Sequence, residues 1–423
     1  MKMQSTLPPT AAPVPLQGLV TGCAALLSTR SSRDRLEREI RDTFGVEHVF
    51  LVSSGKAALA LILSGLRLLS SKRKVVMPAY TCYSVPSAVV RAGLDVTLCD
   101  VDPTTLDLDK KQLERTLDEH TLCVLPTHLF GLPVDVEGVQ ALCRPRGITV
   151  VEDAAQALGG VCRGRWLGTI GDVGFFSLGR GKNISSGGGG VIVTRSSTMA
   201  GAIQQEYDKL PTESRWTAVK NLAELSATEA FIRPQLYWLP AGLPFLGLGE
   251  TRFYRDFPVE RMANARAGTL SGWRRRLEMT NGLRCQQAHA LVQELTMLVP
   301  ETHAITAAEA SYLRLPLLLR DRKVKQALCM RAAALGLGIS GGYPGTIQQI
   351  PELQGRLAVR DYPGATEVVE RLVTLPTHRF VRQADRTRMC RLIQDVSAAG
   401  GLKVNGESDP SHSSPAMRAA SRT

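Results

Sequence analysis

The chain has 423 residues, of which 44% are hydrophobic and 21% are charged, as in an ordinary folded protein. No stretch approaches the roughly 20 consecutive apolar residues that a membrane-spanning helix needs, so we expect no integral membrane segment. Lysine and arginine exceed aspartate and glutamate by 51 − 39 = 12. The basic residues form no stripe with interleaved aromatics, so we expect no nucleic-acid partner. Nine cysteines without a C-x-x-C pair predict neither a disulfide framework nor a zinc site, and we expect no metal.

The N-terminal residues 1–30 contain a segment, Val20 to Cys23, that looks like a lipoprotein processing site. The residues before it include several prolines, and no clean apolar stretch precedes the cysteine. We therefore interpret residues 1–30 as a loose N-terminal arm and expect a cytoplasmic protein.

Strand and helix patterns alternate through the first half of the chain. Leu36, Ile40 and Phe44 recur at helical spacing, and Gly45 ends that helix. Further strand and helix patterns then alternate from residue 49 to residue 180. This alternation predicts a doubly wound, mostly parallel sheet.

The segment 148–194 holds the residues with the clearest chemical meaning. Residues 148–151 are apolar and β-branched, as in a strand buried on both faces, and Asp153 stands at its carboxyl end. Open α/β sheets bind ligands at that edge. A second apolar run, VGFFSL, leads to Lys182, and four glycines follow at 187–190. Glycine lets a backbone or a ligand come close to a strand.

This combination suits pyridoxal phosphate (PLP). The cofactor needs a lysine amine for a Schiff base and an anion at its pyridine nitrogen, and Lys182 and Asp153 are candidates for these roles. The alternative is a surface lysine and a strand-end acid that never meet. The N-terminus of the predicted helix that begins near Gly55 offers N–H groups and a positive dipole to a phosphate.

Several motifs, in order, resemble the DegT/DnrJ/StrS family of PLP-dependent sugar aminotransferases. The resemblance covers roughly residues 35–395. Its pieces are VSSGKAAL at 52–59, VVMPAYTCYSVPSAVVRAGLDVTLCDVDPTTLDLD at 75–109, THLFGLPVD at 127–135, ITVVEDAAQALGG, GDVGFFSLGRGKN and TLPTH at 374–378.

The resemblance implies a fold type I PLP-transferase architecture. A large PLP-binding domain would span residues 31–256, with an insertion at about 196–256, and a smaller α+β domain would span 257–402. Residues 403–423 are rich in serine, proline and charge, so we expect disorder. The resemblance also implies a homodimer.

The resemblance assigns roles to residues around the cofactor. Lys182 would be the catalytic lysine, Asp153 would hold the pyridinium, and Gln156 would lie against the ring. Ser177 and the Gly55 turn would bind the phosphate.

Some positions depart from the family pattern. Lys56 replaces a threonine at the phosphate turn, and it either pairs with the phosphate or points to solvent. Cys82 replaces the aromatic residue that stacks on the ring. Either its thiol packs on the ring, a nearby tyrosine takes over, or it is a core cysteine. His128, at a strand end, and Tyr343, in a tyrosine–proline segment, are candidate substrate contacts, although a lone histidine is more often structural.

The segment 196–256 is longer than in the family. We expect a loop packed at a subunit or domain interface, with a lid or a membrane-surface contact as alternatives. The family's asparagine and arginine that reach a neighbouring subunit's cofactor are not evident, although Arg261 and Asn264 are near.

The resemblance predicts an aminotransferase that moves an amino group from an amino acid, such as glutamate, to a keto sugar, often nucleotide-linked, in polysaccharide or secondary-metabolite biosynthesis. The alternatives are a PLP-binding regulatory relative and a PLP-dependent sugar dehydratase. Dehydratases of the family replace the lysine, and Lys182 speaks against that chemistry.

Overall fold

The computed structural model describes residues 5–28, 31–243, 249, 251–300 and 302–401. The expected tail at 403–423 lies outside the described residues. The division of the chain into domains at residue 256 stays a prediction.

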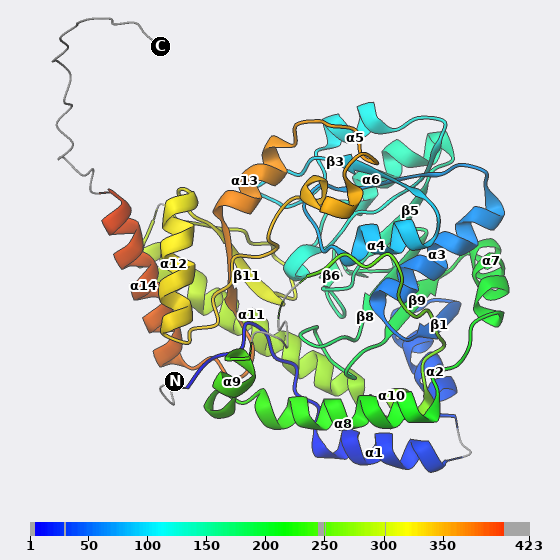
Figure 1. Ribbon diagram of the computed structural model, residues 1–423, viewed down its shortest axis with the longest axis horizontal. Helices are drawn as coiled ribbons and strands as arrows, with labels where there is room; N and C mark the ends of the chain where they lie inside the picture. Colours follow the sequence, from blue (N-terminus) through cyan, green and yellow to red (C-terminus); the bar gives the residue numbers. More distant parts are fainter. Residues whose placement is uncertain (1–4, 29–30, 244–248, 250, 301, 402–423) are drawn as a thin grey trace, which may run out of the picture.

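A seven-stranded sheet forms the centre of the molecule (Figure 1). Its order is β1-β9-β8-β5-β4-β2-β3, and the neighbours from β8 to β3 pair in parallel, whereas β9 runs antiparallel to β8 and β1. The mostly parallel sheet that alternation predicted is confirmed. Its strands are β1 His48–Val52, β2 Lys74–Pro78, β3 Asp95–Cys99, β4 Thr121–Val124, β5 Thr149–Asp153, β8 Val173–Ser177 and β9 Gly190–Thr194.

Helices cover both faces of this sheet. Successive side chains of a strand point to opposite faces: Phe50 and Val52 join the buried cluster that contains α3 and α4, whereas Val49 and Leu51 join the cluster that contains α2 and α6. The doubly wound arrangement is confirmed. The helices up to α7 are α1 Leu16–Leu27, α2 Ser32–Phe44, α3 Gly55–Leu69, α4 Ser84–Arg91, α5 Lys110–Thr116, α6 Val136–Cys143 and α7 Ser197–Asp208.

The C-terminal half adds a small antiparallel sheet, ordered β10-β11-β12, with helices on it. A short hairpin, β6 with β7, lies between β5 and β8 in the sequence. These remaining elements are β6 Val161–Cys162, β7 Arg165–Trp166, β10 His303–Ala304, β11 Arg314–Leu318, β12 Leu372–Pro376, α8 Arg215–Phe231, α9 Pro234–Ala241, α10 Asn264–Gly268, α11 Trp273–Leu298, α12 Arg322–Ala334, α13 Pro363–Arg371 and α14 Gln383–Gly401.

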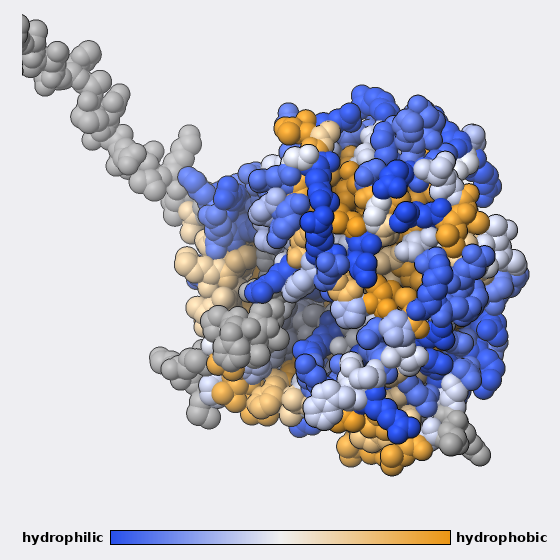
Figure 2. All heavy atoms as spheres, turned by 45° about the vertical axis from the view of Figure 1, so that its right-hand side comes forward, coloured by the Kyte–Doolittle hydropathy of each residue, from blue (hydrophilic) through white to orange (hydrophobic). Residues whose placement is uncertain are grey.

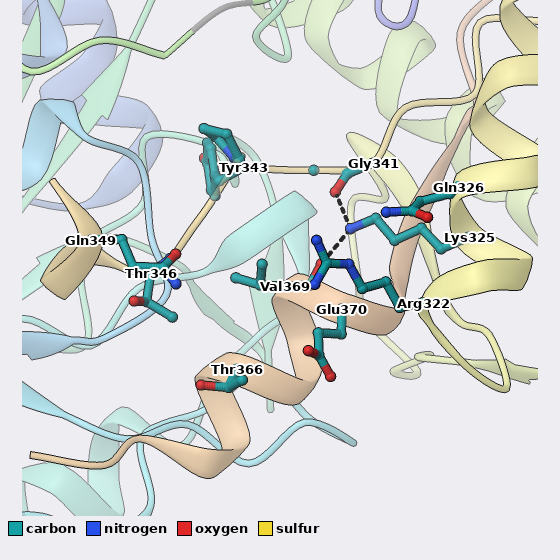
Figure 3. A pocket seen from close by; sticks show the side chains of 12 residues that line it. Arg322, Lys325, Gln326, Gly341, Tyr343, Thr346, Gln349, Thr366, Val369 and Glu370 are labelled. Atoms are coloured by element: carbon teal, nitrogen blue, oxygen red, sulfur yellow. Dashed lines mark hydrogen bonds between the residues drawn. The ribbon is translucent and has the colours of Figure 1, made fainter. Parts of the chain in front are cut away.

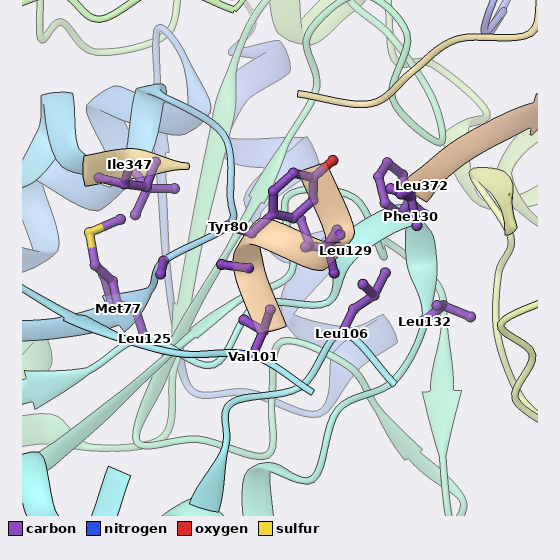
Figure 4. Close-up of a cluster of buried hydrophobic side chains, with 14 of the residues drawn as sticks. Met77, Tyr80, Val101, Leu106, Leu125, Leu129, Phe130, Leu132, Ile347 and Leu372 are labelled. Atoms are coloured by element: carbon purple, nitrogen blue, oxygen red, sulfur yellow. The ribbon is translucent and has the colours of Figure 1, made fainter. Parts of the chain in front are cut away.

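The two sheets share one continuous core. Figure 4 shows Tyr80 and Met77, from the large sheet's side, beside Ile347 and Leu372 from the C-terminal half. Tyr80 and Leu372 are fully buried. Burial of apolar surface therefore holds the C-terminal half against the edge of the large sheet.

Two expectations about the segments are wrong. The N-terminal arm is not loose: Leu7, Ala11 and Val14 are buried, and α1 follows them. The sequence signal was weak because an extended arm held by backbone hydrogen bonds has no periodic pattern. The segment 196–256 is largely helical rather than a loop, since it contains α7, α8 and α9.

Helix α1 carries apolar residues on its outer side. Leu16, Val20 and Leu27 are exposed, while Gly18 and Gly22 pack against α10. In Figure 2 apolar residues gather at the lower edge, where α1 and α8 lie side by side in Figure 1. None of the described helices is both long and apolar enough to cross a membrane.

Candidate functional site

Asp153 and Lys182 lie at the carboxyl edge of the large sheet, near enough for their charges to act on each other. Asp153 ends β5, and the neighbouring parallel strand β8 leads into the loop that carries Lys182. Burial raises the pKa of Asp153, and the charges of Lys182 and His128 oppose that rise. Burial lowers the pKa of Lys182, and Cys82 and Asp153 oppose that fall. Strand ends indicated that the two residues share an edge of the sheet, and the ordered family motifs gave them a joint role.

The carboxylate of Asp153 keeps one oxygen for a ligand. Its Oδ1 accepts a hydrogen bond of 3.0 Å from the Ala155 N–H. No donor within the described residues reaches Oδ2. A protonated ring nitrogen would supply the missing donor and a positive charge, which a nearly buried carboxylate needs.

Glu152 and His128 form a separate, fully buried pair. His128 Nε2 donates to Glu152 Oε1 at 2.8 Å, because His128 Nδ1 already accepts from the Val134 N–H. Glu152 also accepts from backbone N–H groups of the turn at 168–171. Burial acts to raise the pKa of Glu152, but these hydrogen bonds and the charge of His128 outweigh it and lower that pKa.

This geometry holds the turn between the β6–β7 hairpin and β8 in place. Both ring nitrogens of His128 are engaged and its side chain has no exposed surface. We therefore do not carry His128 forward as a substrate contact. The structural interpretation of a lone histidine fits better.

Gln156 links the large sheet to the tyrosine–proline segment. Its Nε2 donates to Tyr343 Oη at 2.6 Å, and its Oε1 accepts from the Phe130 N–H at 3.0 Å. The Tyr343 N–H in turn donates to Tyr80 Oη at 3.0 Å. Burial raises the pKa of Tyr343 well above its usual value, so its hydroxyl stays protonated. Two sequence-predicted residues thus meet directly.

The phosphate turn predicted at Gly55 lies beside Ser177. A Cβ on Gly55 would come within 2.8 Å of the Ser177 Cβ, so only glycine fits there. Ser54 caps helix α3 by accepting from the Ala57 N–H. The Lys56 N–H has no acceptor among the described residues, whereas Gly55 takes part in the bridge that joins Ser54 to Gly189. A helix N-terminus with free N–H groups is the usual environment for a phosphate.

Lys56 packs against aromatic rings rather than pointing freely to solvent. Its ammonium lies 4.6 Å from the ring centroid of Tyr254 and 4.6 Å from that of Phe257. Burial lowers the pKa of Lys56, and Cys82 opposes that fall. The solvent alternative is therefore wrong, whereas the phosphate contact stays a prediction.

Cys82 faces the site between two lysines, since it acts on the pKa of both Lys56 and Lys182. Its Sγ lies 3.4 Å from Ser84 Oγ and 3.4 Å from Thr251 Oγ1. Cys82 is half-buried and also packs against the large buried cluster, so the core alternative stays open. Its contact with a cofactor ring stays a prediction.

The segment 251–257, with Thr251, Tyr254 and Phe257, covers this side of the site. A lid was one of the alternatives that the sequence left open for residues 196–256, and the contacts of Thr251, Tyr254 and Phe257 with Cys82 and Lys56 agree with it. The only signal was its richness in aromatic residues, which says nothing about a contact with residues near position 80.

A cavity of about 460 Å³ adjoins the tyrosine–proline segment (Figure 3). Tyr343 and Thr346 form one side of it, and Arg322 and Lys325 of α12 face them. Lys325 Nζ donates to the carbonyls of Gly341 and Val369, whereas the exposed Arg322 extends towards the cavity. The cavity is polar and carries charges of both signs, because Glu370 lines it together with Arg322 and Lys325.

Comparison with known proteins identifies the group to which this architecture belongs. Residues 24–209 match the model of the DegT/DnrJ/EryC1/StrS aminotransferase family. The matched residues are fewer than half of the chain, and over them the chain is similar to this family. The resemblance seen in the sequence is thereby confirmed.

Relatives in the family have several functions. A UDP-N-acetyl-3-dehydro-alpha-D-glucosamine 3-aminotransferase of Acidithiobacillus ferrooxidans is 35% identical over 160 residues, which are 38% of this chain and 43% of the relative. GDP-perosamine synthase of Vibrio cholerae is 31% identical over 163 residues, 38% of this chain and 44% of the relative. A pleiotropic regulatory protein of Geobacillus stearothermophilus is 34% identical over 128 residues, 30% and 34% of the two chains. The matches thus span less than half the length of these relatives.

Solved structures of the DegT/DnrJ/EryC1/StrS type match nearly the whole fold. The aminotransferase PseC of Helicobacter pylori superposes with a TM-score of 0.76 at 14% identity, over 93% of this chain and all of PseC. The GDP-4-keto-6-deoxy-D-mannose-3-dehydratase of E. coli, solved with bound hydrated PLP, gives 0.73 at 15% identity, over 92% of this chain and 100% of the dehydratase. The predicted fold type I architecture is confirmed.

Proposed function

We propose that this protein is a PLP-dependent aminotransferase that moves an amino group from an amino acid, such as glutamate, to a nucleotide-linked keto sugar. The observation that carries the proposal is the placement of Lys182 and Asp153 at one sheet edge. The N-terminus of α3 supports the proposal as well. A phosphate bound there would give the cofactor a third point of attachment, beside Lys182 and Asp153. The family and the names of the relatives support the choice of sugar as acceptor.

The residues of the site fit PLP. Lys182 would hold the cofactor covalently, Asp153 Oδ2 would accept from its ring nitrogen, and the Gly55 turn with Ser177 would bind its phosphate. When bound, PLP would supply an electron sink that makes the α carbon of the amino acid acidic. Gln156, held at both ends of its amide by Tyr343 and Phe130, would fix the plane of the ring.

Proton transfer would fall to Lys182. Burial lowers the pKa of its amine, which raises the fraction of the neutral base at neutral pH. The freed amine would take the α proton of the donor and return a proton in the opposite half-reaction. Asp153 would remain ionised, because the ring cation beside it favours the charged form.

The cavity beside Tyr343 would receive the acceptor. It opens next to the Gln156–Tyr343 hydrogen bond, and Arg322 lies at its rim. Arg322 would offer a cationic partner to a substrate that carries phosphate, beside the carboxylate of Glu370. This deduction supports a nucleotide-linked sugar over a free one.

A homodimer in the cytoplasm would be the active form. The exposed apolar residues Leu16 and Val20 of α1, with Trp216 of α8, support a partner surface, since a contiguous apolar area marks an interaction site. Sedimentation velocity would measure the subunit number, and a monomer at micromolar concentration would contradict this part of the proposal.

The rival function is a PLP-binding regulatory protein. A relative named as a regulatory protein and the unusual Lys56 and Cys82 favour it. Addition of glutamate to the PLP-loaded protein separates the two functions. An aminotransferase should lose its absorbance near 400–430 nm (roughly the range of PLP Schiff bases) and release 2-oxoglutarate. An unchanged spectrum would favour regulation. A sugar dehydratase would need the lysine replaced, and Lys182 is present.

A further inference from the structure

Arg284 of α11 is a fully buried cation behind the loop that carries Lys182. Its side chain has no exposed surface, and no carboxylate lies within ion-pair distance of it among the described residues. Burial lowers its pKa to about 9, and Cys285 opposes that fall. A buried guanidinium without an acid is costly unless its N–H groups find acceptors. Its acceptors here are all backbone carbonyls.

Those carbonyls belong to the lysine itself and to two other positions. Arg284 Nη2 donates to the Lys182 carbonyl at 3.2 Å and to the Ala11 carbonyl at 3.0 Å. Its Nη1 donates to the Asn183 carbonyl at 3.2 Å. One guanidinium therefore joins α11, the lysine loop and the N-terminal arm.

The N-terminal arm, residues 6–14, holds the same loop from the other side. Thr10 Oγ1 donates to the Gly181 carbonyl at 3.1 Å. The consecutive carbonyls of residues 181, 182 and 183 are thus all bound by side chains from distant parts of the chain. These hydrogen bonds hold the backbone from which the lysine side chain extends.

The TLPTH motif acts on the arm as well. His378 Nε2 donates to the Pro8 carbonyl at 2.8 Å, since its Nδ1 accepts from the Phe380 N–H. Burial lowers the pKa of His378 to about 3, so the ring is neutral and keeps this donor. The motif therefore acts on the site indirectly, because it holds the N-terminal arm that contacts the lysine loop.

We propose that Arg284 is a positioning residue for Lys182, with the N-terminal arm as its second anchor. The lysine amine sits at the end of a flexible four-carbon stem. Its distance from Asp153 and from a bound donor depends on where the loop backbone lies, and a misplacement of about 1 Å costs roughly 100-fold in rate. The inference rests on the proposed function, because it gives Lys182 the cofactor.

The test compares two arginines on one helix. Arg284→Met keeps the core filled but removes the donors. Arg276→Met is the matched control, because Arg276 stands about two turns earlier, burial lowers its pKa to about 10, and it donates to the Thr269 carbonyl instead. For each PLP-loaded protein we would measure borohydride trapping at Lys182, the pH at which the Schiff-base absorbance changes, and kcat and KM separately.

We expect Arg284→Met to shift the pH midpoint of the absorbance, to slow trapping at least tenfold, and to lower kcat about 100-fold with little change in KM. Arg276→Met should leave the midpoint and the trapping rate as in the wild type. Arg284→Lys, which can still donate to a carbonyl, should recover part of the loss. Thr10→Val should show a smaller shift in the same direction. If Arg284→Met does not fold, the same measurements on Arg284→Lys and Thr10→Val decide the question.

Different outcomes separate the two claims. A wild-type protein in which borohydride fixes no PLP at Lys182 contradicts the proposed function itself. A wild type that is trapped at Lys182, with Arg284→Met matching it in midpoint and trapping rate, overturns the positioning role alone. Equal shifts in Arg284→Met and Arg276→Met would also overturn it, because they would reflect general loss of stability.

Discussion

Lys182 and Asp153 oppose the effect of burial on each other's protonation. Burial lowers the pKa of the lysine and raises that of the aspartate, and the opposite charge of each partner limits the shift of the other. A pair of this kind is unfavourable in a site that remains empty, and a ligand that brings one positive charge to Asp153 would resolve it. Changes to either residue should therefore act on cofactor binding and chemistry before they act on the fold.

Lys182→Ala should abolish covalent attachment of PLP, because no other lysine among the described residues is placed opposite Asp153. Borohydride reduction followed by peptide mapping measures the attachment. Lys220→Ala, at an exposed position on α8, is the control and should bind as the wild type does. A reduced adduct in the Lys182→Ala protein would show that another lysine carries the cofactor.

Asp153→Asn should keep the fold but slow the half-reaction with glutamate by at least 100-fold, since a desolvated charge pair contributes a few kcal/mol. Stopped-flow absorbance measures the rate. The neighbouring change Glu152→Gln should have the opposite effect. It should lower the melting temperature, because Glu152 binds His128 and three backbone N–H groups. It should change the absorbance spectrum little. Near-normal rates in Asp153→Asn would remove it as the partner of the ring.

The charge of Lys56 should matter more than its shape. If Lys56 contacts the PLP phosphate, Lys56→Thr should keep binding, since a hydroxyl serves this place in the family. Lys56→Glu should weaken binding at least tenfold, because it sets a carboxylate beside a dianion at a helix N-terminus. PLP titration at low salt measures both. Equal affinities would leave Lys56 with its contacts to Tyr254 and Phe257 only.

The stability of the protein should fall as the pH rises from about 4.5 to about 7 because of Glu229. Burial raises the pKa of Glu229 to about 7, although the hydrogen bond from the Val14 N–H and the charges of Arg276 and Arg233 act to lower it. The unfolded carboxyl titrates near 4.5. Between that pH and about 7 the folded protein binds more protons than the unfolded chain, so the stability contributed by Glu229 is present in full only below pH 4.5 and is lost as the pH rises. Thermal melts across pH measure the effect. Glu229→Gln should flatten this part of the profile, and an unaltered slope would contradict the assignment.

Strand patterns indicate that Asp153 and the loop leading to Lys182 lie at one edge of the sheet, because parallel strands align their carboxyl ends. The family motifs give the two residues their joint role. The family motifs likewise lead to Gly55, Ser177 and Gln156. Asp153 and Ser177 end strands and Gly55 begins a helix, whereas Gln156 and Lys182 lie in the loops that follow those strands. The roles of these residues towards PLP stay predictions.

Other features are beyond sequence patterns. The rings that pack on Lys56 come from a segment about 200 residues later, and nothing local marks that contact. Arg284 lies in a helix with many polar residues, so its sequence context predicts a surface position. The structure instead buries it under the N-terminal arm and the lysine loop. His128 at a strand end has the pattern of a ligand, but its side chain points to Glu152. Long-range packing decides all three.

The most direct test of the proposed function is a single-turnover experiment with labelled donor. The PLP-loaded protein would be mixed with 15N-glutamate without any acceptor, denatured, and analysed by mass spectrometry. The proposed mechanism predicts 15N-labelled pyridoxamine phosphate in an amount equal to the active subunits, with matching 2-oxoglutarate, and none from Lys182→Ala. Unlabelled PLP recovered intact from the wild type would contradict it.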